Sequence, residues 1–488
     1  MKKLLIISLL FLGAHSPVFA HQSILSGSVG WQSCQLPGFK HWFSEQPLEK
    51  LQCGYIEVPL SYEKNQFVNR AIKVKRVKLA VTRLPATDKR KGSIVMISGG
   101  PGMSGINPYI TEDSVTKVLL SSFDIIGYDP RGVGNSIPKI SCQQAETADN
   151  SSISTEASLK AWVSSCIKHT SANVLKHIGS DEATDDLESI RQALGEEKLT
   201  AVAYSYGTQV AAMYAERYPK KTRAIVLDGV VDISEDDITT QINQGRGFQL
   251  SLERFAHYCA EKSSCPLDPI LGDVSDLYHK LLNQIDSETI FDAEGKRITS
   301  DEITRVVTEK LLWSTYWDEL VVILKQVSTG NVDKTTTELL SGNLFSASSD
   351  AQIAITCADH ARLIKNPEWL KRGRIQAITA LAYGNAKLEA SDNLAEQCDY
   401  WPFRGKIQAH IPKIDAELPQ LLFVAQRFDP TTPHSNATKM SGYFRSPLLT
   451  KEGDGHTLAL AGEEQCINRE VVDYLLFPEK IRRDKHCY

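Results

Sequence analysis

Short runs of β-branched and aromatic residues alternate with helical stretches between residues 50 and 235. Four apolar runs have the length of buried strands and lie at residues 93–98, 123–128, 199–204 and 223–228. Residues 181–194 have apolar positions at helical spacing and are followed by Gly195, a common residue just after a helix. Residues 54–60 and 72–82 alternate between apolar and polar positions, as antiparallel strands at a sheet edge do. The pattern predicts an α/β protein with a mostly parallel central sheet flanked by helices.

The pattern changes after Val231. Between residues 236 and 404 helical spacing replaces the short apolar runs, most clearly at residues 241–259, 274–285 and 300–327. Trp313 and Trp317 lie four residues apart on one face of the last of these predicted helices. We expect both to belong to the core of this segment rather than to a substrate platform, since large aromatic side chains are usually buried.

Strand and helix patterns typical of the first part return near the C-terminus. Residues 421–425 predict a strand, and residues 464–477 predict a closing helix. We therefore expect one sheet domain, formed by residues 21–235 and 405–488, with a helical lid inserted at residues 236–404.

The first 20 residues have the features of a bacterial-type signal peptide. Lys2 and Lys3 precede an apolar run at residues 4–12, and residues 18–20 (Val-Phe-Ala) include the small residues that a signal peptidase accepts. The alternative, a membrane anchor, would need roughly 20 apolar residues. The position directly after residue 20 is not a Cys that could carry a lipid. We therefore expect an exported protein without a membrane anchor, in the periplasm or outside the cell.

Charge gives little information about partners. The chain has 54 Lys and Arg against 59 Asp and Glu, with no block of like charge, so no nucleic-acid or membrane-surface partner is expected. No feature of the sequence predicts an oligomeric state.

The cysteines are more informative, because they indicate the compartment of the protein. All 10 cysteines follow the signal peptide, and none belongs to a Cys-x-x-Cys pair that would suggest zinc or redox chemistry. An even number of exported cysteines predicts disulfides. About 945 full pairings are possible. We expect neighbours along the chain to pair, and the alternative is that one or two pairs stay buried free thiols. The expected pairs are Cys34 with Cys53, Cys142 with Cys166, Cys259 with Cys265, Cys357 with Cys398, and Cys466 with Cys487.

A serine stands where a predicted strand meets a helical stretch. In residues 203–208, Ala-Tyr-Ser-Tyr-Gly-Thr, Ser205 directly follows the apolar run at 199–204. A nucleophile elbow places its serine on such a turn and needs small residues two positions before and after, here Ala203 and Gly207. Because the usual first glycine is an alanine, the motif alone also fits a tight turn whose hydroxyl caps a helix.

A glycine-rich loop strengthens the first interpretation. Residues 98–105, Ser-Gly-Gly-Pro-Gly-Met-Ser-Gly, follow a predicted strand. The backbone N–H groups of such a loop can stabilise an oxyanion. We expect the oxyanion-hole donors to be Gly100 and, from the elbow, Tyr206. Phosphate binding is not expected, since the loop lacks the Lys-Ser/Thr of a P-loop and the G-x-G-x-x-G spacing.

A nucleophilic serine needs a histidine base, and the base needs an acid that orients it. With a nucleophile elbow the chain order is Ser, then Asp or Glu, then His. Asp429 follows the predicted strand at 421–425, and His456 lies in the glycine-flanked segment 453–456. We expect these two residues to complete a triad with Ser205. The alternatives are Asp228 or Asp454 for the acid and His434 or His360 for the base.

Together these motifs resemble those of a known family. The glycine-rich loop, residues 129–136 (Asp-Pro-Arg-Gly-Val-Gly-Asn-Ser), the elbow, and residues 429–433 (Asp-Pro-Thr-Thr-Pro) are similar to those of the tripeptidyl aminopeptidase-like branch of the α/β hydrolases, relatives of the prolyl aminopeptidases. Ser98 stands where prolyl aminopeptidases usually have His, which favours the tripeptidyl branch. Residues 354–359 and 398–401 resemble lid segments of that branch and support a disulfide between the cysteines that they contain.

The resemblance covers nearly the whole mature chain and implies an α/β-hydrolase fold with an inserted helical lid. It implies a secreted serine exopeptidase, without metal or organic cofactor, whose partners are peptide substrates with a free N-terminus. Such an enzyme must bind the substrate ammonium, for which a desolvated carboxylate is the natural partner. Asp359 is our candidate, and a carboxylate that braces a lid helix is an equally good interpretation of that residue. Asp129 and Arg131 are expected to brace the loop below the site.

Two other functions are kept as alternatives. A carboxylesterase or lipase could use the same triad, because the lid decides which substrates enter. A non-catalytic binding protein on the same scaffold is less consistent with the sequence, since all three triad residues are present. Ser205 also argues against an epoxide hydrolase or a dehalogenase, which would need Asp at the elbow.

Overall fold

The computed structural model describes residues 29–488 except for 44–48, 63–75, 108–114, 143–155, 263–264, 342–348, 361–366, 382–393, 404 and 461–463. The predicted signal peptide, residues 1–20, lies outside the described residues, as does the first part of the predicted strand at 72–82. Where the chain is described, no helix has the length and apolar character needed to cross a membrane.

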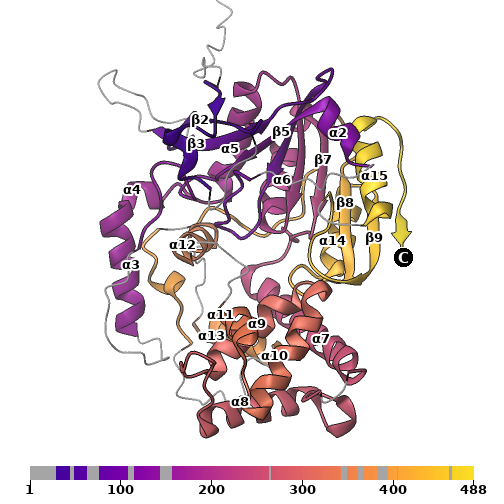
Figure 1. Ribbon diagram of the computed structural model, residues 1–488. Helices are drawn as coiled ribbons and strands as arrows, with labels where there is room; N and C mark the ends of the chain where they lie inside the picture. The colour runs from indigo at the N-terminus through magenta and orange to yellow at the C-terminus, as the bar shows by residue number, and fades with distance from the viewer. Residues whose placement is uncertain are drawn as a thin grey trace, which may run out of the picture.

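A ten-stranded sheet forms the upper half of the molecule as drawn in Figure 1, with the strand order β1-β2-β3-β5-β4-β6-β7-β8-β9-β10. The strands are β1 Gln32–Ser33, β2 Gln52–Pro59, β3 Arg76–Leu84, β4 Gly92–Ile97, β5 Phe123–Tyr128, β6 Leu199–Tyr204, β7 Thr222–Asp228, β8 Leu422–Phe428, β9 Leu448–Asp454 and β10 Lys485–Cys487. The β1–β2, β2–β3 and β3–β5 pairs are antiparallel, and the other pairs are parallel. The predicted fold class, a mostly parallel sheet flanked by helices, is confirmed.

Helices cover both faces of the sheet because its strands are buried on both sides. In β7, Ile225 and Leu227 belong to one apolar cluster and Ala224 and Val226 to another, as the two-residue period of a strand requires. Helices α5 Ser180–Ala193, α6 Tyr206–Arg217 and α14 His434–Tyr443 pack into the first cluster, and α2 Lys117–Ser122 and α15 Gln465–Leu476 pack into the second. The remaining helices of this part are α1 Pro37–Lys40, α3 Glu156–Thr170 and α4 Ala172–Leu175.

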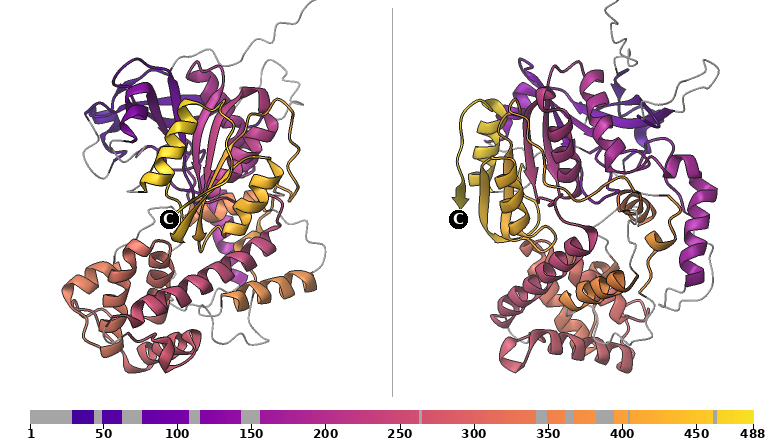
Figure 2. Two further views of the ribbon diagram at one scale, coloured as in Figure 1. Left: turned by 90° about the vertical axis from the view of Figure 1, so that its right-hand side faces the viewer. Right: turned by 180° about the vertical axis from the view of Figure 1, so that it is seen from behind.

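A run of helices separates β7 from β8 along the chain, where the sequence predicts helices. They are α7 Asp237–Ala260, α8 Val274–Glu288, α9 Ser300–Leu311, α10 Trp317–Thr329, α11 Lys334–Ser341, α12 Ser349–Asp359 and α13 Pro367–Ala380. Figures 1 and 2 show α7 to α11 as a layer below the sheet. This layer has its own apolar core, formed by buried residues between Leu252 and Leu340. We call residues 236–404 the helical insertion.

One predicted helix, residues 300–327, is wrong. The structure ends α9 at Leu311 and starts α10 at Trp317, with a short 3-10 turn, Ser314–Tyr316, between them. The break separates the two tryptophans that the sequence pattern places together. Trp317 is buried in the core of the helical insertion, whereas Trp313 has extended backbone and is only half-buried.

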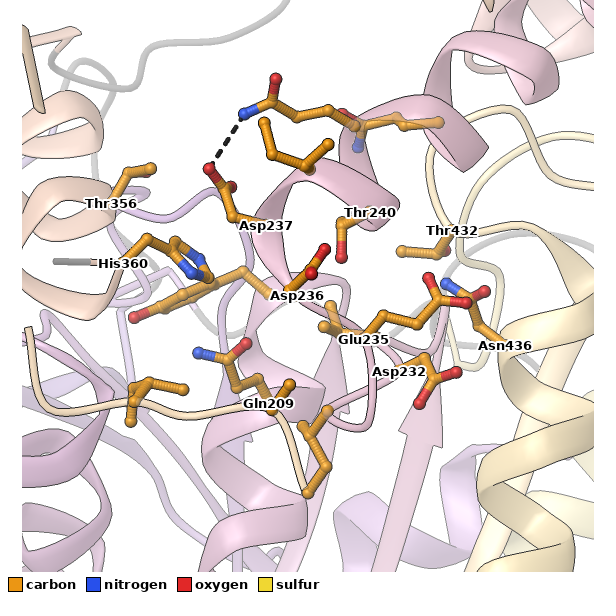
Figure 3. A pocket seen from close by; sticks show the side chains of 18 of the residues that line it. Gln209, Asp232, Glu235, Asp236, Asp237, Thr240, Thr356, His360, Thr432 and Asn436 are labelled. Carbon is orange, nitrogen blue, oxygen red and sulfur yellow. Dashed lines mark hydrogen bonds between the residues drawn. The ribbon is translucent and has the colours of Figure 1, made fainter. Parts of the chain in front are cut away.

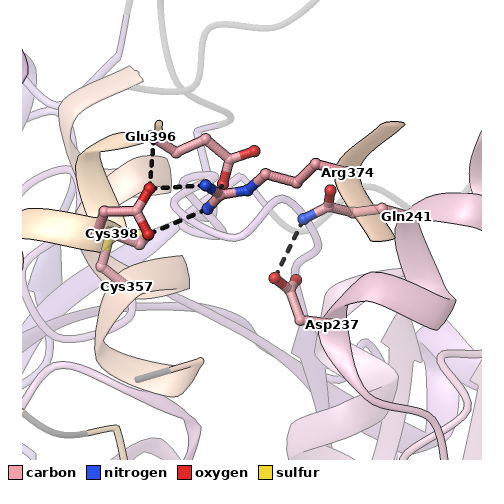
Figure 4. The surroundings of a disulfide bond; sticks show 7 residues. Asp237, Gln241, Cys357, Arg374, Glu396 and Cys398 are labelled. Atoms are coloured by element: carbon pink, nitrogen blue, oxygen red, sulfur yellow. Dashed lines mark hydrogen bonds and ion pairs between the residues drawn. A yellow bond between two sulfur atoms is a disulfide. The ribbon is translucent and has the colours of Figure 1, made fainter. Parts of the chain in front are cut away.

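Five disulfides join the cysteines that are neighbours along the chain: Cys34–Cys53, Cys142–Cys166, Cys259–Cys265, Cys357–Cys398 and Cys466–Cys487. Each pair matches the expected one, and no cysteine is free. The Cys357–Cys398 bridge ties α12 to the 3-10 turn Gln397–Tyr400, beside which Arg374 of α13 binds Asp399 at 2.7 Å (Figure 4). Disulfides form and persist in oxidising compartments, so the five bridges indicate a periplasmic or extracellular protein.

Candidate active site

Ser205 occupies the sharp turn between β6 and α6. Its backbone has φ 52° and ψ −126°, a conformation that non-glycine residues rarely adopt. The turn is held in place because the Ser205 N–H donates to the Asp228 carbonyl at 2.9 Å. A Cβ on Gly207 would lie 2.6 Å from the Ser98 carbonyl oxygen, so only glycine lets α6 approach the neighbouring chain this closely. This is the strand-turn-helix geometry that a nucleophile elbow requires.

The glycine-rich loop after β4 lies directly against the elbow. A Cβ on Gly99 would lie 2.9 Å from the Ser205 Cβ, and Gly100 has φ 110°. Gly100, Ser205 and Tyr206 line one pocket. Tyr206 is the first residue of α6, and N–H groups in the first helical turn have no acceptor within the helix. The structure thus brings together the two residues expected to donate to an oxyanion.

Asp429 and His456 meet at the ends of β8 and β9. Both side chains are buried, and His456 Nδ1 lies 2.8 Å from Asp429 Oδ2 and 3.1 Å from Oδ1. Asp429 Oδ1 also accepts the N–H groups of Thr431 at 2.9 Å and Thr432 at 2.8 Å, which orient the carboxylate. With the Nδ1 proton donated to Asp429, Nε2 is the histidine nitrogen that can accept a proton.

The end of β7 contacts both the serine and the histidine. The Asp228 carbonyl accepts the Ser205 N–H, and the next residue, Gly229, packs against the His456 ring. A Cβ on Gly229 would lie 2.8 Å from His456 Cε1, so a larger residue there would displace the imidazole. Ser205, Asp429 and His456 therefore all lie near the end of β7.

The charged groups around His456 affect how readily it takes up a proton. Burial disfavours the imidazolium, but the adjacent Asp429 carboxylate outweighs burial, so the pKa of His456 is raised above its usual value. Burial raises the pKa of Asp228 to about 6, although two backbone hydrogen bonds oppose this shift. Asp228 lies close enough to His456 to add to the rise in the histidine pKa.

The structure also shows where the alternative residues lie. Asp228 accepts the N–H groups of Leu458 and Ala459 at 2.6 and 2.7 Å, so it holds the segment after His456 rather than the imidazole. Asp454 forms an ion pair with Arg254 of α7. His434 Nε2 lies 2.8 Å from Thr450 Oγ1, and its pKa is lowered by burial and by Arg427. His360 lines the pocket.

Asp359, the residue expected to bind the substrate ammonium, does not line the pocket in the described structure. It is 1% exposed at the end of α12, and its carboxylate accepts hydrogen bonds from Ser180 N at 2.6 Å, Ser180 Oγ at 2.7 Å and Tyr206 Oη at 2.7 Å. Burial raises the pKa of Asp359. Because these contacts occupy both carboxylate oxygens, the geometry fits the alternative interpretation, a brace that reaches Tyr206.

The pocket in front of Ser205 has a volume of about 660 Å³ and is strongly acidic. Its walls come from the sheet domain and from the helical insertion (Figure 3). Four carboxylates line it, those of Asp232, Glu235, Asp236 and Asp237, and its described lining contains no Lys or Arg. Sequence reasoning missed these residues, although the acidic run just after β7 was a visible signal.

The acidic residues differ in how far the protein already uses them. Lys439 contacts Asp232 at 3.2 Å and Glu235 at 2.5 Å. Asp236 caps α7 by accepting the Thr239 N–H at 2.8 Å through Oδ1, and Asp237 Oδ2 accepts from Gln241 at 3.1 Å. Asp236 and Asp237 each have a second carboxylate oxygen that no described hydrogen bond uses. Within the described ranges, no group of three or more His, Cys, Asp or Glu side chains could hold a metal ion.

Comparisons with known proteins agree with this geometry. The family model described as alpha/beta hydrolase fold matches residues 92–462. The putative hydrolase YuaR of Escherichia coli is 42% identical over 95% of this chain and 93% of its own length. The serine protease Hip1 of Mycobacterium tuberculosis is 30% identical over 93% of this chain and 89% of its own length.

Two more distant relatives carry names of different activities. The tripeptidyl aminopeptidase of Streptomyces lividans is 27% identical over 94% of this chain and 86% of its own length. Carboxylesterase B of M. tuberculosis is 26% identical over 93% of this chain and 88% of its own length. The fold, the family model and the full-length relatives lead to one conclusion: this chain belongs to the α/β-hydrolase family.

Proposed function

We propose that the protein is an exported serine exopeptidase that hydrolyses peptide bonds near a free N-terminus, as a tripeptidyl or a prolyl or aminoacyl aminopeptidase does. Ser205 is the nucleophile, His456 the general base and Asp429 the acid that orients it. The backbone N–H groups of Gly100 and Tyr206 form the oxyanion hole. Residues 236–404 serve as the lid over the site, and residues 1–20 direct export.

The reaction is an acyl transfer in two steps. His456 Nε2 takes the Ser205 proton as Oγ attacks the scissile carbonyl, and the oxyanion is stabilised by the Gly100 and Tyr206 N–H groups. His456 then gives the proton to the leaving amine, which leaves an acyl-enzyme. Water, activated by His456, releases the N-terminal fragment. Asp359 supports this step indirectly, because its hydrogen bond to the Tyr206 hydroxyl holds the first turn of α6.

The observation that carries the exopeptidase proposal is the charge of the pocket. Four carboxylates and no described Lys or Arg line the space in front of Ser205, which suits a ligand that brings a positive charge. Asn436 Oδ1 is a further buried acceptor in this wall and has no hydrogen-bond partner among the described residues. A substrate ammonium offers N–H donors that can bind such carboxylates with charge-assisted hydrogen bonds. We assign the ammonium contact to Asp236 and Asp237, each of which keeps a carboxylate oxygen that no described residue binds.

The names of the relatives are consistent with this proposal. One relative is named a serine protease and another a tripeptidyl aminopeptidase, and both match nearly the whole chain. A carboxylesterase is the second candidate function, because a third relative carries that name. An esterase acting on neutral acyl groups would gain nothing from four carboxylates in its pocket, which is why we rank it second.

A comparison of substrates tests the proposal directly. The protein should hydrolyse tripeptide and aminoacyl 4-nitroanilides with free N-termini and lose most of this activity when the same peptides are N-acetylated. Equal turnover of free and blocked peptides, or preference for short-chain nitrophenyl esters, would instead support the esterase.

The nucleophile is tested with a matched variant. Ser205→Ala should abolish turnover and labelling by a fluorophosphonate probe, while circular dichroism shows a folded protein. If the wild-type protein were not labelled at all, the catalytic proposal itself would fail, and a binding protein on a hydrolase scaffold would be the better description.

A further inference from the structure

Two residues of the helical insertion contact three consecutive residues, 454–456, of the segment that carries His456. The indole Nε1–H of Trp313 donates to the His456 carbonyl oxygen, and Trp313 pairs with Gly455 in an isolated antiparallel bridge. The next residue, Ser314, donates through its hydroxyl to the Asp454 carbonyl at 3.0 Å. The backbone from Asp454 to His456 is therefore fixed from outside the sheet domain, at the break between α9 and α10.

A second contact comes from α7. The Arg254 guanidinium binds the Asp454 carboxylate with two hydrogen bonds, one of them from Nη2 to Oδ2 at 2.8 Å. The same guanidinium lies over the Phe428 ring, 3.5 Å from its centroid. Phe428 directly precedes Asp429, so one arginine touches both the strand end that carries the acid and the segment that carries the base.

We propose that Trp313 and Arg254 are positioning residues, through which the helical insertion sets the place of His456 relative to Ser205 and Asp429. The inference rests on the proposed role of His456 as the base. The lid is then part of the catalytic apparatus as well as a cover, and a displacement of the insertion would move the base.

The glycines around His456 explain why this segment is held by contacts from the helical insertion. His456 follows Gly453 and Gly455, and glycines give the backbone more freedom than other residues do. Gly455 has φ 149°, and a Cβ there would lie 2.8 Å from Gln426 Nε2, so a stiffer residue does not fit. The flexible segment must therefore be held by its neighbours, and Trp313 supplies a hydrogen bond to the base residue itself. Small misplacements of a catalytic group can cost up to about a hundredfold in rate.

Trp313→Phe tests the proposal, and Trp317→Phe is its matched control. The first variant keeps an aromatic ring but removes the donor to His456. The second changes a buried tryptophan four positions away. It removes an indole N–H that has no hydrogen-bond partner among the described residues. We expect Trp313→Phe to lower kcat and the rate of fluorophosphonate labelling about ten- to hundredfold with little change in KM. We expect Trp317→Phe to leave both rates near those of the wild type.

The pH profile separates positioning from a merely structural role. If Trp313→Phe loosens the contact between His456 and Asp429, the acid limb of the labelling rate should move to lower pH, because Asp429 no longer raises the histidine pKa as strongly. A variant that only unfolds more easily would lower the active fraction without moving this limb. Equal labelling rates and equal pH profiles for Trp313→Phe and Trp317→Phe would overturn the proposal while leaving the wild-type activity, and so the proposed function, intact.

A double-mutant cycle tests the arginine contact. Arg254→Gln and Asp454→Asn should each slow labelling, and the double variant should be no slower than the more affected single variant, since both remove the same contact. Additive losses would mean that the two residues act separately and would remove Arg254 from the proposal.

Discussion

At the scale of single residues, the surroundings of His456 set the pH at which the proposed base can work. The imidazole must be neutral to accept the Ser205 proton, and its pKa is raised because the Asp429 carboxylate outweighs burial. Activity should therefore fall as the pH decreases through a value above the usual histidine pKa of about 6.5. Asp429, whose Oδ2 lies 2.8 Å from His456 Nδ1, contributes more to this rise in pKa than Asp228 does.

Asp429→Asn tests this electrostatic arrangement. The variant keeps the shape of the side chain but removes the charge that favours the imidazolium, so the acid limb of kcat/KM should move to lower pH. The rate should also fall about 10³- to 10⁴-fold, because an amide does not hold the imidazole in the required tautomer. The pH dependence of kcat/KM measures both effects. A variant whose acid limb stays in place would show that another group, with Asp228 the nearest candidate, determines that limb.

The sequence could predict which candidate residues lie close together where each follows a strand end, and not where a side chain is bound by distant partners. Ser205, Asp429 and His456 each follow a strand or lie in a glycine-flanked segment, and their order along the chain was enough to select them. Asp359 looked equally available in the sequence. Its carboxylate is occupied by Ser180 and Tyr206, more than 150 positions away along the chain, and no local pattern reveals that.

At the scale of elements, helical spacing predicted which segments are helices but not where they stop. Residues 300–327 keep apolar positions at helical spacing throughout, yet α9 and α10 are separate helices. The reason is tertiary: the chain between them leaves the helical path so that Trp313 and Ser314 can bind the segment of Asp454 to His456. Such a break is decided by a contact with a strand end that lies about 140 positions later in the sequence.

The disulfide between α12 and the turn at Gln397–Tyr400 allows a prediction about the stability of the protein. Replacing both Cys357 and Cys398 by Ser should destabilise the protein by about 4 kcal/mol, whereas the same change at Cys259 and Cys265 should cost about 2 kcal/mol, because the closed loops span 41 and 6 residues. Chemical denaturation under non-reducing conditions measures both.

Replacing Cys357 and Cys398 should also lower activity at denaturant concentrations too low to unfold the protein. Asp359, two positions after Cys357, holds Tyr206 of the proposed oxyanion hole, so a looser α12 should lower kcat. Arg374 remains paired with Asp399 in this variant and should limit the loss (Figure 4). Equal activities of the two disulfide variants would argue against a role for α12 in positioning Tyr206.

At the scale of the whole molecule, the described pocket lies where the sheet domain and the helical insertion meet. The sequence pattern predicted helices between residues 236 and 404, and the structure places α7 to α13 there. It could not predict which side chains of the insertion face Ser205, because that depends on how two separately packed cores lie against each other. The start of α7, at Asp236 and Asp237, is the place where the two parts join and where the pocket is most acidic.

Asp236→Asn tests whether this charge selects the substrate. Asn is as good an N-cap as Asp, so the start of α7 should be preserved while one pocket carboxylate is lost. We expect KM for tripeptide 4-nitroanilides with free N-termini to rise about fivefold, as for a solvent-exposed ion pair, and more in the Asp236→Asn/Asp237→Asn double variant. Short-chain esters, which carry no ammonium, should be hydrolysed as before.

Asp273→Asn is the matched control for this last prediction. Asp273 caps α8 as Asp236 caps α7, accepting the N–H groups of Ser275 at 3.0 Å and Asp276 at 3.2 Å, but it does not line the pocket. The substitution changes the net charge by the same amount, so a long-range effect of charge would appear in both variants. A specific contact predicts that only Asp236→Asn raises KM. Added salt screens the attraction in the wild type, so it should reduce the difference in KM between Asp236→Asn and the wild type. Equal KM values for the two variants would mean that the acidic start of α7 does not bind the substrate N-terminus.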